Sequence, residues 1–206
     1  MPPAFRRSPL ALAILGVLKA GALHPYGIQR RLRQWGKDQV VNVGQRSQLY
    51  KTIARLEAAG YVIAETTERD ANYPERTKYA ITEAGEAVAV EWIADMIAKP
   101  HNEYPEFPAA LSFAPMLPPE RLRQLLEIRR DALTRQHAEL TAGLATEIAG
   151  HRLPRVVLLD TELQHATVTT ELEWVAGIIA ALDDGSLTWT AEELIAQAEA
   201  ASAASL

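Results

Sequence analysis

The chain of 206 residues contains no cysteine. This absence excludes disulfide bonds, thiol catalysis, thiolate-bound zinc and a thiol redox switch. It fits a reducing cytoplasm, which we expect to be the location of the protein. Long hydrophobic runs are missing too. The apolar stretch from Leu10 to Leu18 is far short of the ~18 residues that a membrane-spanning helix needs, and no later segment qualifies.

Residue sets that support catalysis are also missing. The sequence has no phosphate-binding glycine loop and no nucleophile elbow around a serine. The five histidines occur at no metal-ligand spacing: His24, His101, His137, His151 and His165. We therefore predict that the protein is not an enzyme and uses no cofactor and no metal.

Charge is distributed unevenly along the chain. Residues 1–83 carry 13 Lys and Arg against 7 Asp and Glu, a net charge of +6. Residues 84–206 carry 8 against 19, a net charge of −11. A basic segment attracts phosphate, whereas an acidic one discourages non-specific wrapping by nucleic acid. The split predicts two domains with different partners, residues 1–83 and residues 84–206.

The amino terminus has two interpretations. Arg6 and Arg7 precede the apolar run, and Ala20-Gly21-Ala22 follows it, as in a secretory signal. Against a signal, Lys19 separates the run from the cleavage-like site, and apolar residues continue beyond it. We expect a buried first helix here.

Hydrophobic periodicity and capping signals predict a mainly α-helical chain with one small β-hairpin. Helices are expected at residues 10–20, 25–35, 46–59, 83–98, 119–150 and 154–182, with strands at 61–66 and 77–82. Residues 99–118 contain five prolines and are expected to form an irregular connector. Thr190 and Glu193 form a capping-box pattern for a short tail helix.

The helix expected at 46–59 has the character of a DNA-recognition helix. Leu49, Ile53 and Leu56 form one apolar stripe, and polar side chains occupy the opposite face. A polar helix followed by a hairpin is typical of a winged helix-turn-helix DNA-binding domain. The predicted DNA contacts are Gln45, Arg46, Ser47, Gln48, Tyr50, Lys51 and Arg55 on the helix, and Tyr73, Arg76 and Lys78 in the wing. The alternative for each is an ordinary solvated side chain.

The acidic part is expected to be a helical dimerisation domain. The last long helix is apolar on more than one face, and such a helix must be covered on both. Trp92 and Trp174 lie on helices assigned to this domain and are candidates for the wall of a site for a small aromatic effector. The alternative is that both are ordinary interface residues.

One set of positions in residues 8–90 follows a known family pattern: Leu12, Ile14, Leu15, His24, Tyr26, Leu49, Tyr50, Arg55, Leu56, Glu57, Gly60, Tyr61, Val62, Lys78, Tyr79, Ile81, Thr82 and Gly85. Through these positions, the segment resembles the PadR family of transcriptional regulators. Pro25, Gln48 and Lys51 depart from the family pattern. The stretches FPAALSFAPMLPPERLRQLLEIR and ELEWVAGII look, more loosely, like the larger AphA-like members.

The resemblance implies a homodimer that exchanges its carboxy-terminal helices. It implies a ligand-responsive repressor that binds an inverted-repeat operator in double-stranded DNA. The alternative function is a winged-helix protein-interaction module that does not bind DNA directly.

Overall fold

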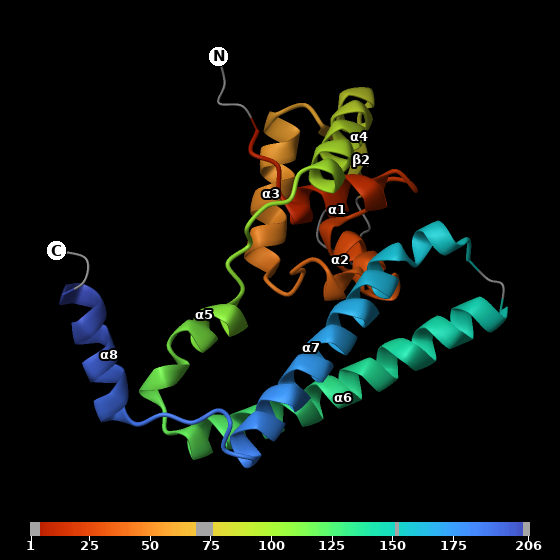
Figure 1. Cartoon of the computed structure of the whole chain (residues 1–206). Helices are drawn as coiled ribbons and strands as arrows, with labels where there is room; N and C mark the ends of the chain where they lie inside the picture. Colours follow the sequence, from red (N-terminus) through yellow and green to blue (C-terminus); the bar gives the residue numbers. More distant parts are fainter. Residues whose placement is uncertain (1–4, 69–75, 151–152, 204–206) are drawn as a thin grey trace. The chain divides into compact units, whose positions relative to one another are not determined.

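The computed structural model describes residues 5–68, 76–150 and 153–203. The chain divides into two compact units, Met1–Asn102 and Glu103–Leu206 (Figure 1). Within the described residues the secondary structure is helical apart from one two-stranded hairpin and an isolated bridge. The predicted fold class is therefore confirmed.

The first unit is built around helix α1 (Pro9–Leu18). Ser8 caps this helix by accepting a hydrogen bond from the Ala11 N–H at 3.2 Å, and Pro9 occupies its first turn. The buried side chains of α1 contact the apolar faces of α2 (Pro25–Gln34) and α3 (Arg46–Ala58). The apolar run near the amino terminus thus forms a core helix, as expected.

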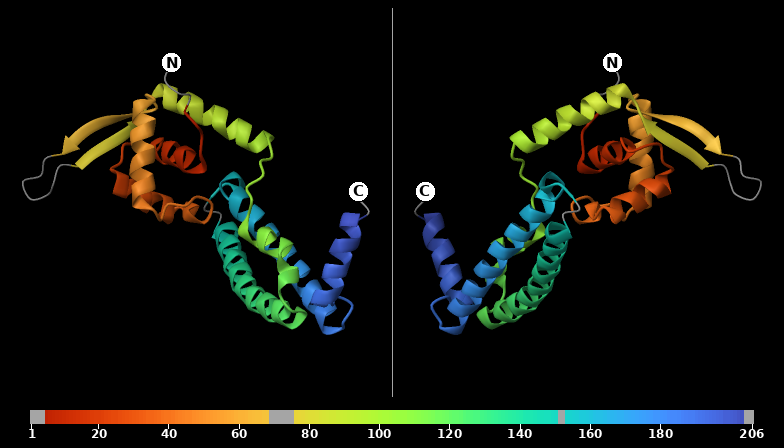
Figure 2. Two further views of the ribbon diagram at one scale, coloured as in Figure 1. Left: turned by 90° about the vertical axis from the view of Figure 1, so that its left-hand side faces the viewer. Right: turned by 90° about the vertical axis from the view of Figure 1, so that its right-hand side faces the viewer.

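The hairpin of β1 (Val62–Glu68) and β2 (Arg76–Ile81) follows α3 directly. Its strands are antiparallel, with Val62 opposite Ile81 and a register shift at Ala64/Thr66. Leu23, between α1 and α2, exchanges two backbone hydrogen bonds of 3.0 Å with Tyr79 of β2. This bridge ties the base of the hairpin to the three-helix core, and the strands extend away from the helices (Figure 2).

Helix α4 (Glu83–Ala98) belongs to the first unit because it packs on α1. Trp92 of α4 stacks on Phe5 with ring centroids 5.3 Å apart and meets Tyr61 edge-to-face at 6.0 Å. The boundary between the units consequently falls after residue 102. The sequence interpretation placed this boundary after residue 83, at the first residue of the helix.

The second unit contains α5 (Glu106–Ser112), α6 (Pro119–Gly150), α7 (Leu159–Asp183) and α8 (Ala191–Ala203). Helix α5 corrects the expectation of an irregular connector. Pro105 is its N-cap and Pro108 lies in its first turn, where a missing N–H costs no intrahelical hydrogen bond. Short 3₁₀ turns, Ala114–Met116 and Arg155–Val157, precede α6 and α7.

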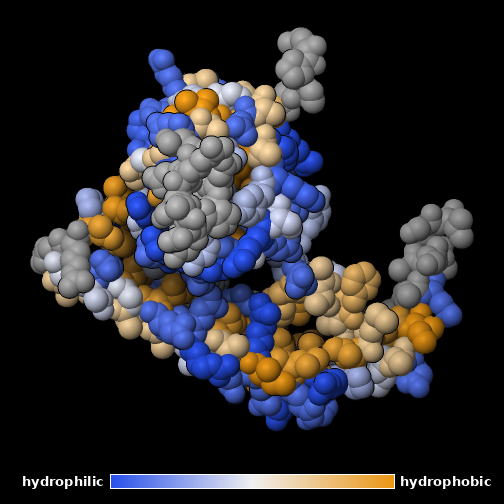
Figure 3. Space-filling model, turned by 180° about the vertical axis from the view of Figure 1, so that it is seen from behind, coloured by the Kyte–Doolittle hydropathy of each residue, from blue (hydrophilic) through white to orange (hydrophobic). Residues whose placement is uncertain are grey.

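Helix α7 buries only one of its two apolar faces. Val168, Val175 and Ile179 pack against the leucines of α6. Leu159, Leu163 and Trp174 remain exposed, and so do Phe113 and Met116 before α6. Several apolar side chains accordingly reach the surface of the carboxy-terminal unit (Figure 3).

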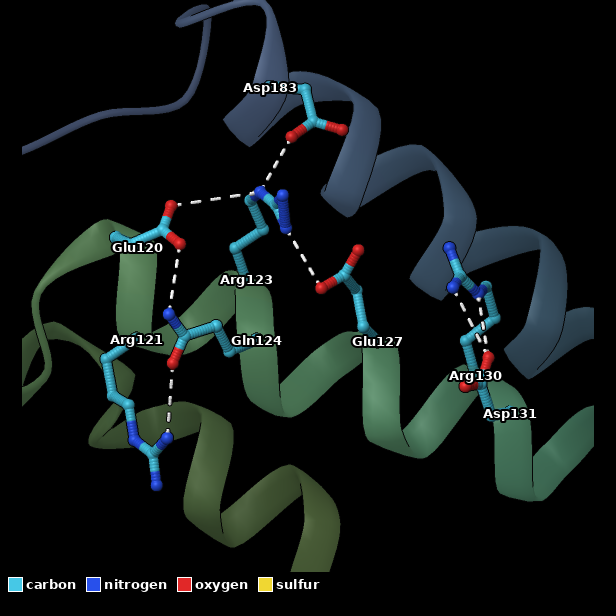
Figure 4. Close-up of polar contacts among 8 residues, drawn as sticks. All are labelled: Glu120, Arg121, Arg123, Gln124, Glu127, Arg130, Asp131 and Asp183. Carbon is cyan, nitrogen blue, oxygen red and sulfur yellow. Dashed lines mark hydrogen bonds and ion pairs between the residues drawn. The ribbon is translucent and has the colours of Figure 1, made fainter.

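Ion pairs also join α6 to α7. Arg123 of α6 contacts Asp183 at the end of α7 at 2.8 Å and Glu127 of its own helix at 2.9 Å (Figure 4).

The predicted capping box of α8 is confirmed. The Thr190 N–H donates to Glu193 Oε2 at 2.8 Å, and the Glu193 N–H donates to Thr190 Oγ1 at 3.2 Å.

Candidate nucleic-acid interface

Helix α3 presents a polar face on a rigid support. Leu49, Thr52, Ile53 and Leu56 are buried against the core, so the orientation of the helix about its axis is fixed. All seven helix residues predicted to contact DNA are exposed: Gln45, Arg46, Ser47, Gln48, Tyr50, Lys51 and Arg55. Amide, hydroxyl and basic groups of this kind can donate to base edges and to phosphate oxygens.

Two of these side chains have particular surroundings. The Arg55 guanidinium, in the last turn of α3, lies over the Phe5 ring at 4.8 Å from its centroid. This cation therefore already has a partner within the protein. Tyr50 is 50% exposed in the first half of the helix. The amino-terminal half of α3 therefore offers the freer set of donors.

The wing is described only in part. Tyr73 lies outside the described residues, and for Arg76 the structure describes only the backbone at the start of β2. Lys78 lies on β2 and is half-buried. The next residue is Tyr79, and the pKa of its hydroxyl is raised above the ordinary value. Burial is the main cause, and the charges of Glu57 and Tyr50 add to it.

Helix α2 has an exposed polar face of its own, which the sequence interpretation did not assign to DNA. Tyr26, Arg30 and Arg33 are exposed and follow the i, i+4, i+7 spacing of one helix face. Arg33 also lines an open cavity of about 450 Å³ with residues 38–44 of the turn before α3. The helical spacing of these residues could have identified them from the sequence as one exposed face of α2.

The turn between α2 and α3 is held by side-chain hydrogen bonds. Gln29 Nε2 donates to the Val43 carbonyl at 2.6 Å, and the Gly44 N–H donates to Asn42 Oδ1 at 3.1 Å. The Val43 side chain is itself buried. These contacts fix the peptide that leads into α3.

The two tryptophans predicted to bind an effector belong to different units and have different surroundings. Trp92 is 8% exposed and is part of the aromatic packing of the first unit. Trp174 of α7 is 44% exposed and meets Phe107 of α5 edge-to-face at 6.1 Å. Sequence position alone did not distinguish these two environments.

Trp174 lines an open, largely apolar cavity of about 700 Å³ in the second unit. Arg129 also lines it, with its guanidinium 3.4 Å from the Phe107 ring centroid and paired with Glu171. A cavity of this size with aromatic walls and a few polar groups can hold a small organic molecule.

The parts of the chain that the structure describes contain no group of three or more histidine and acidic side chains placed to hold a metal ion. His137 and His165 do face each other across α6 and α7, with centroids 4.5 Å apart. None of the described helices combines the length and the apolar character needed to cross a membrane.

Comparison with known proteins shows what this chain is similar to in sequence and in fold. Residues 14–91 match the model of the transcriptional regulator PadR-like family. None of the curated proteins matches the chain in sequence.

Solved structures share the fold over most of the chain. PadR of Bacillus subtilis in complex with operator DNA is 20% identical, with a TM-score of 0.69 over 85% of this chain and 99% of that one. The structure of the same protein in complex with p-coumaric acid is 20% identical, with a TM-score of 0.67 over 84% of this chain and 98% of that one. A PadR-like transcriptional regulator from Bacillus cereus is 15% identical, with a TM-score of 0.59 over 85% of this chain and 99% of that one. These likenesses establish the fold.

Proposed function

We propose that the chain, whose residues 14–91 match the PadR-like family of transcriptional regulators, is a homodimeric, ligand-responsive repressor. The observation that carries this proposal is the exposed polar face of α3, set on a buried stripe and followed directly by a hairpin. In this arrangement the recognition helix enters the major groove and the wing contacts the flanking backbone.

The seven exposed residues of α3 and its N-cap are the proposed contacts, with Tyr73, Arg76 and Lys78 as wing contacts. Arg46 and Lys51 carry the positive charge of the first half of α3. Gln45, Ser47 and Gln48 supply groups that can read base edges, because amides and hydroxyls both donate and accept hydrogen bonds. A polar set of this kind suits sequence-specific binding better than phosphate binding alone.

DNA binding is tested by footprinting and gel shift on the DNA upstream of the protein's own gene. We expect a protected inverted repeat whose half-sites lie about one or two helical turns apart. Lys51→Ala should weaken binding and lower the slope of log affinity against log salt by about 0.9 for each phosphate contact removed. Lys99→Ala, at the end of α4, is the matched control and should leave the slope unchanged. An unchanged slope in both variants would exclude phosphate contact by Lys51.

The exposed apolar residues of α7 support a homodimer. Leu163 is 69% exposed on the α7 face that a single chain leaves uncovered, and a second copy can bury it. Light scattering after size exclusion should give twice the chain mass, and Leu163→Glu should lower it. A monomeric mass for the wild-type chain at micromolar concentration contradicts the dimer.

The cavity beside Trp174 supports the response to a small aromatic effector. An aromatic ring can stack on Trp174, and an acidic group can compete with Glu171 for hydrogen bonds from Arg129. Titration with p-coumaric acid should quench the protein fluorescence and release DNA. Trp174→Phe should abolish most of the quenching, whereas Trp92→Phe should retain it. Equal quenching in both variants would place the binding site elsewhere, and quenching without release of DNA would contradict an effector role.

A protein-interaction module without direct DNA binding is the second candidate. The acidic balance of residues 84–206 favours this function, because it repels nucleic acid. The two functions differ in salt dependence. A steep loss of duplex binding with rising salt supports the regulator, and its absence supports the module.

A further inference from the structure

Gln29 of α2 is a buried polar side chain in a largely apolar core, as is Thr52 of α3. It is 3% exposed, and its Nε2 donates to the Val43 carbonyl at 2.6 Å, across 14 residues of sequence. A buried amide is costly unless it is hydrogen-bonded, so this contact strongly favours one geometry of the turn. We propose that Gln29 is a positioning residue for DNA sequence recognition, because it fixes the peptide that carries the first turn of α3.

Three consecutive residues before α3 are held by three different contacts. The Asn42 side chain accepts a hydrogen bond from the Gly44 N–H at 3.1 Å. The Val43 side chain is buried in the core, and its carbonyl is bound by Gln29. Gln45 follows at once, and its carbonyl accepts the first helical hydrogen bonds of α3, from Gln48 and Leu49. The position of Val43 is therefore transmitted directly to the start of the helix.

The start of α3 depends on this support. Unlike Ser8 at α1 and Thr82 at α4, the N-cap residue Gln45 forms no side-chain capping hydrogen bond. The first turn of a recognition helix is the part that meets base edges. Hydrogen bonds to bases tolerate only a few tenths of an ångström, whereas lysine and arginine can follow a displaced phosphate. Loss of the Gln29 contact should thus impair base discrimination more than total affinity.

This inference depends on the proposed DNA-binding function, and its test begins with the wild-type chain. The full-length protein selects a preferred duplex from a random pool. Dissociation constants are then measured for that duplex and for a scrambled duplex of equal composition. Their ratio measures discrimination, and the slope against salt measures phosphate contact.

Two substitutions remove the contact in different ways. Gln29→Met keeps the length and approximate volume of the side chain but has no donor. Gln29→Glu keeps the shape, but a carboxylate cannot donate to the Val43 carbonyl. Both should lower the discrimination ratio by about tenfold or more, the size of a lost base-pair contact. Binding to the scrambled duplex and its salt slope should stay within about twofold of the wild type.

Ile14→Val is the stability control, because Ile14 of α1 is fully buried in the same core and lies outside the turn in sequence. It should lower the melting temperature while keeping the discrimination ratio. An unchanged ratio in Gln29→Met, or an equal loss in Ile14→Val, overturns the inference. If Gln29→Glu fails to fold, Gln29→Met decides alone. A wild-type chain that selects no sequence overturns the proposed function itself and this inference with it.

Discussion

Replacement of Gly85 by alanine should destabilise the first unit, because α4 approaches the hairpin most closely at this glycine. A Cβ atom at Gly85 would lie 2.1 Å from the Tyr61 carbonyl oxygen and 2.9 Å from Ile81 Cγ1. Ordinary van der Waals contact requires about 3.5 Å, so the start of α4 would have to move by roughly 1 Å. The obstacle is backbone, which cannot rotate away as a side-chain end could.

That movement opposes a set of hydrogen bonds around Thr82. The Gly85 N–H donates to Thr82 Oγ1 at 3.0 Å, Thr82 Oγ1 donates to the Gly60 carbonyl at 2.7 Å, and the Thr82 N–H donates to the Tyr61 carbonyl at 3.1 Å. A lost N-cap costs about 1 kcal/mol, and overpacking costs about 1–3 kcal/mol. The gain in helix propensity returns about 1 kcal/mol. We expect a net loss of about 1–3 kcal/mol, which lowers the melting temperature of a unit of this size by roughly 5–20 °C.

Urea and thermal unfolding followed by circular dichroism measure this loss. Gly16→Ala is the matched control, because Gly16 of α1 is exposed and a Cβ there would have no described atom within 4 Å. It should raise the free energy of unfolding by about 0.5–1 kcal/mol. If Gly85→Ala unfolds within about 0.5 kcal/mol of the wild type, the close approach of Tyr61 to α4 is wrong.

Three further substitutions test separate contacts. The raised pKa of Tyr79 means that its stabilising contribution is complete below about pH 10 and is lost as pH rises through the folded-state pKa. Tyr79→Phe should remove this alkaline loss in thermal melts, and an unchanged pH profile would contradict it. Trp189 Nε1 donates to the Leu117 carbonyl at 3.1 Å, so Trp189→Phe should cost about 1 kcal/mol in urea unfolding; no cost would show that the bond adds nothing. Arg55→Ala should cost about 0.5–1 kcal/mol through its contact with Phe5 and change the salt slope of DNA binding less than Lys51→Ala does. Equal slopes in gel shifts would assign Arg55 to a phosphate.

Elements with strong local signals were predicted closely. Helix α4 has the predicted bounds, Glu83–Ala98, because Thr82 provides a cap and no proline or glycine interrupts its last three turns. Helix α5 was missed, because prolines usually end helices and only the backbone shows that Pro105 and Pro108 occupy its first turn. A proline-rich segment indicates that a helix begins or ends there, but the sequence does not show which of the two applies.

The polar face of the recognition helix was also predictable. The spacing of Leu49, Ile53 and Leu56 fixes which side is buried, and the exposed side follows from helix geometry. Contacts between distant residues were not predictable in this way. Arg55 meets Phe5 across 50 residues of sequence, and the sequence interpretation had treated it only as a DNA contact.

Apart from helix α5, the sequence by itself determined the order of the main elements, the charge split and the exposed face of α3, because periodicity, capping and composition are local properties. Tertiary structure alone decided which polar residue is buried and what each tryptophan contacts. Gln29 and Gln34 are alike in sequence terms, yet one holds the turn before α3 and the other is exposed. Trp92 lies in a core and Trp174 beside a cavity. These differences arise from the packing of segments far apart in the chain, which no local pattern encodes.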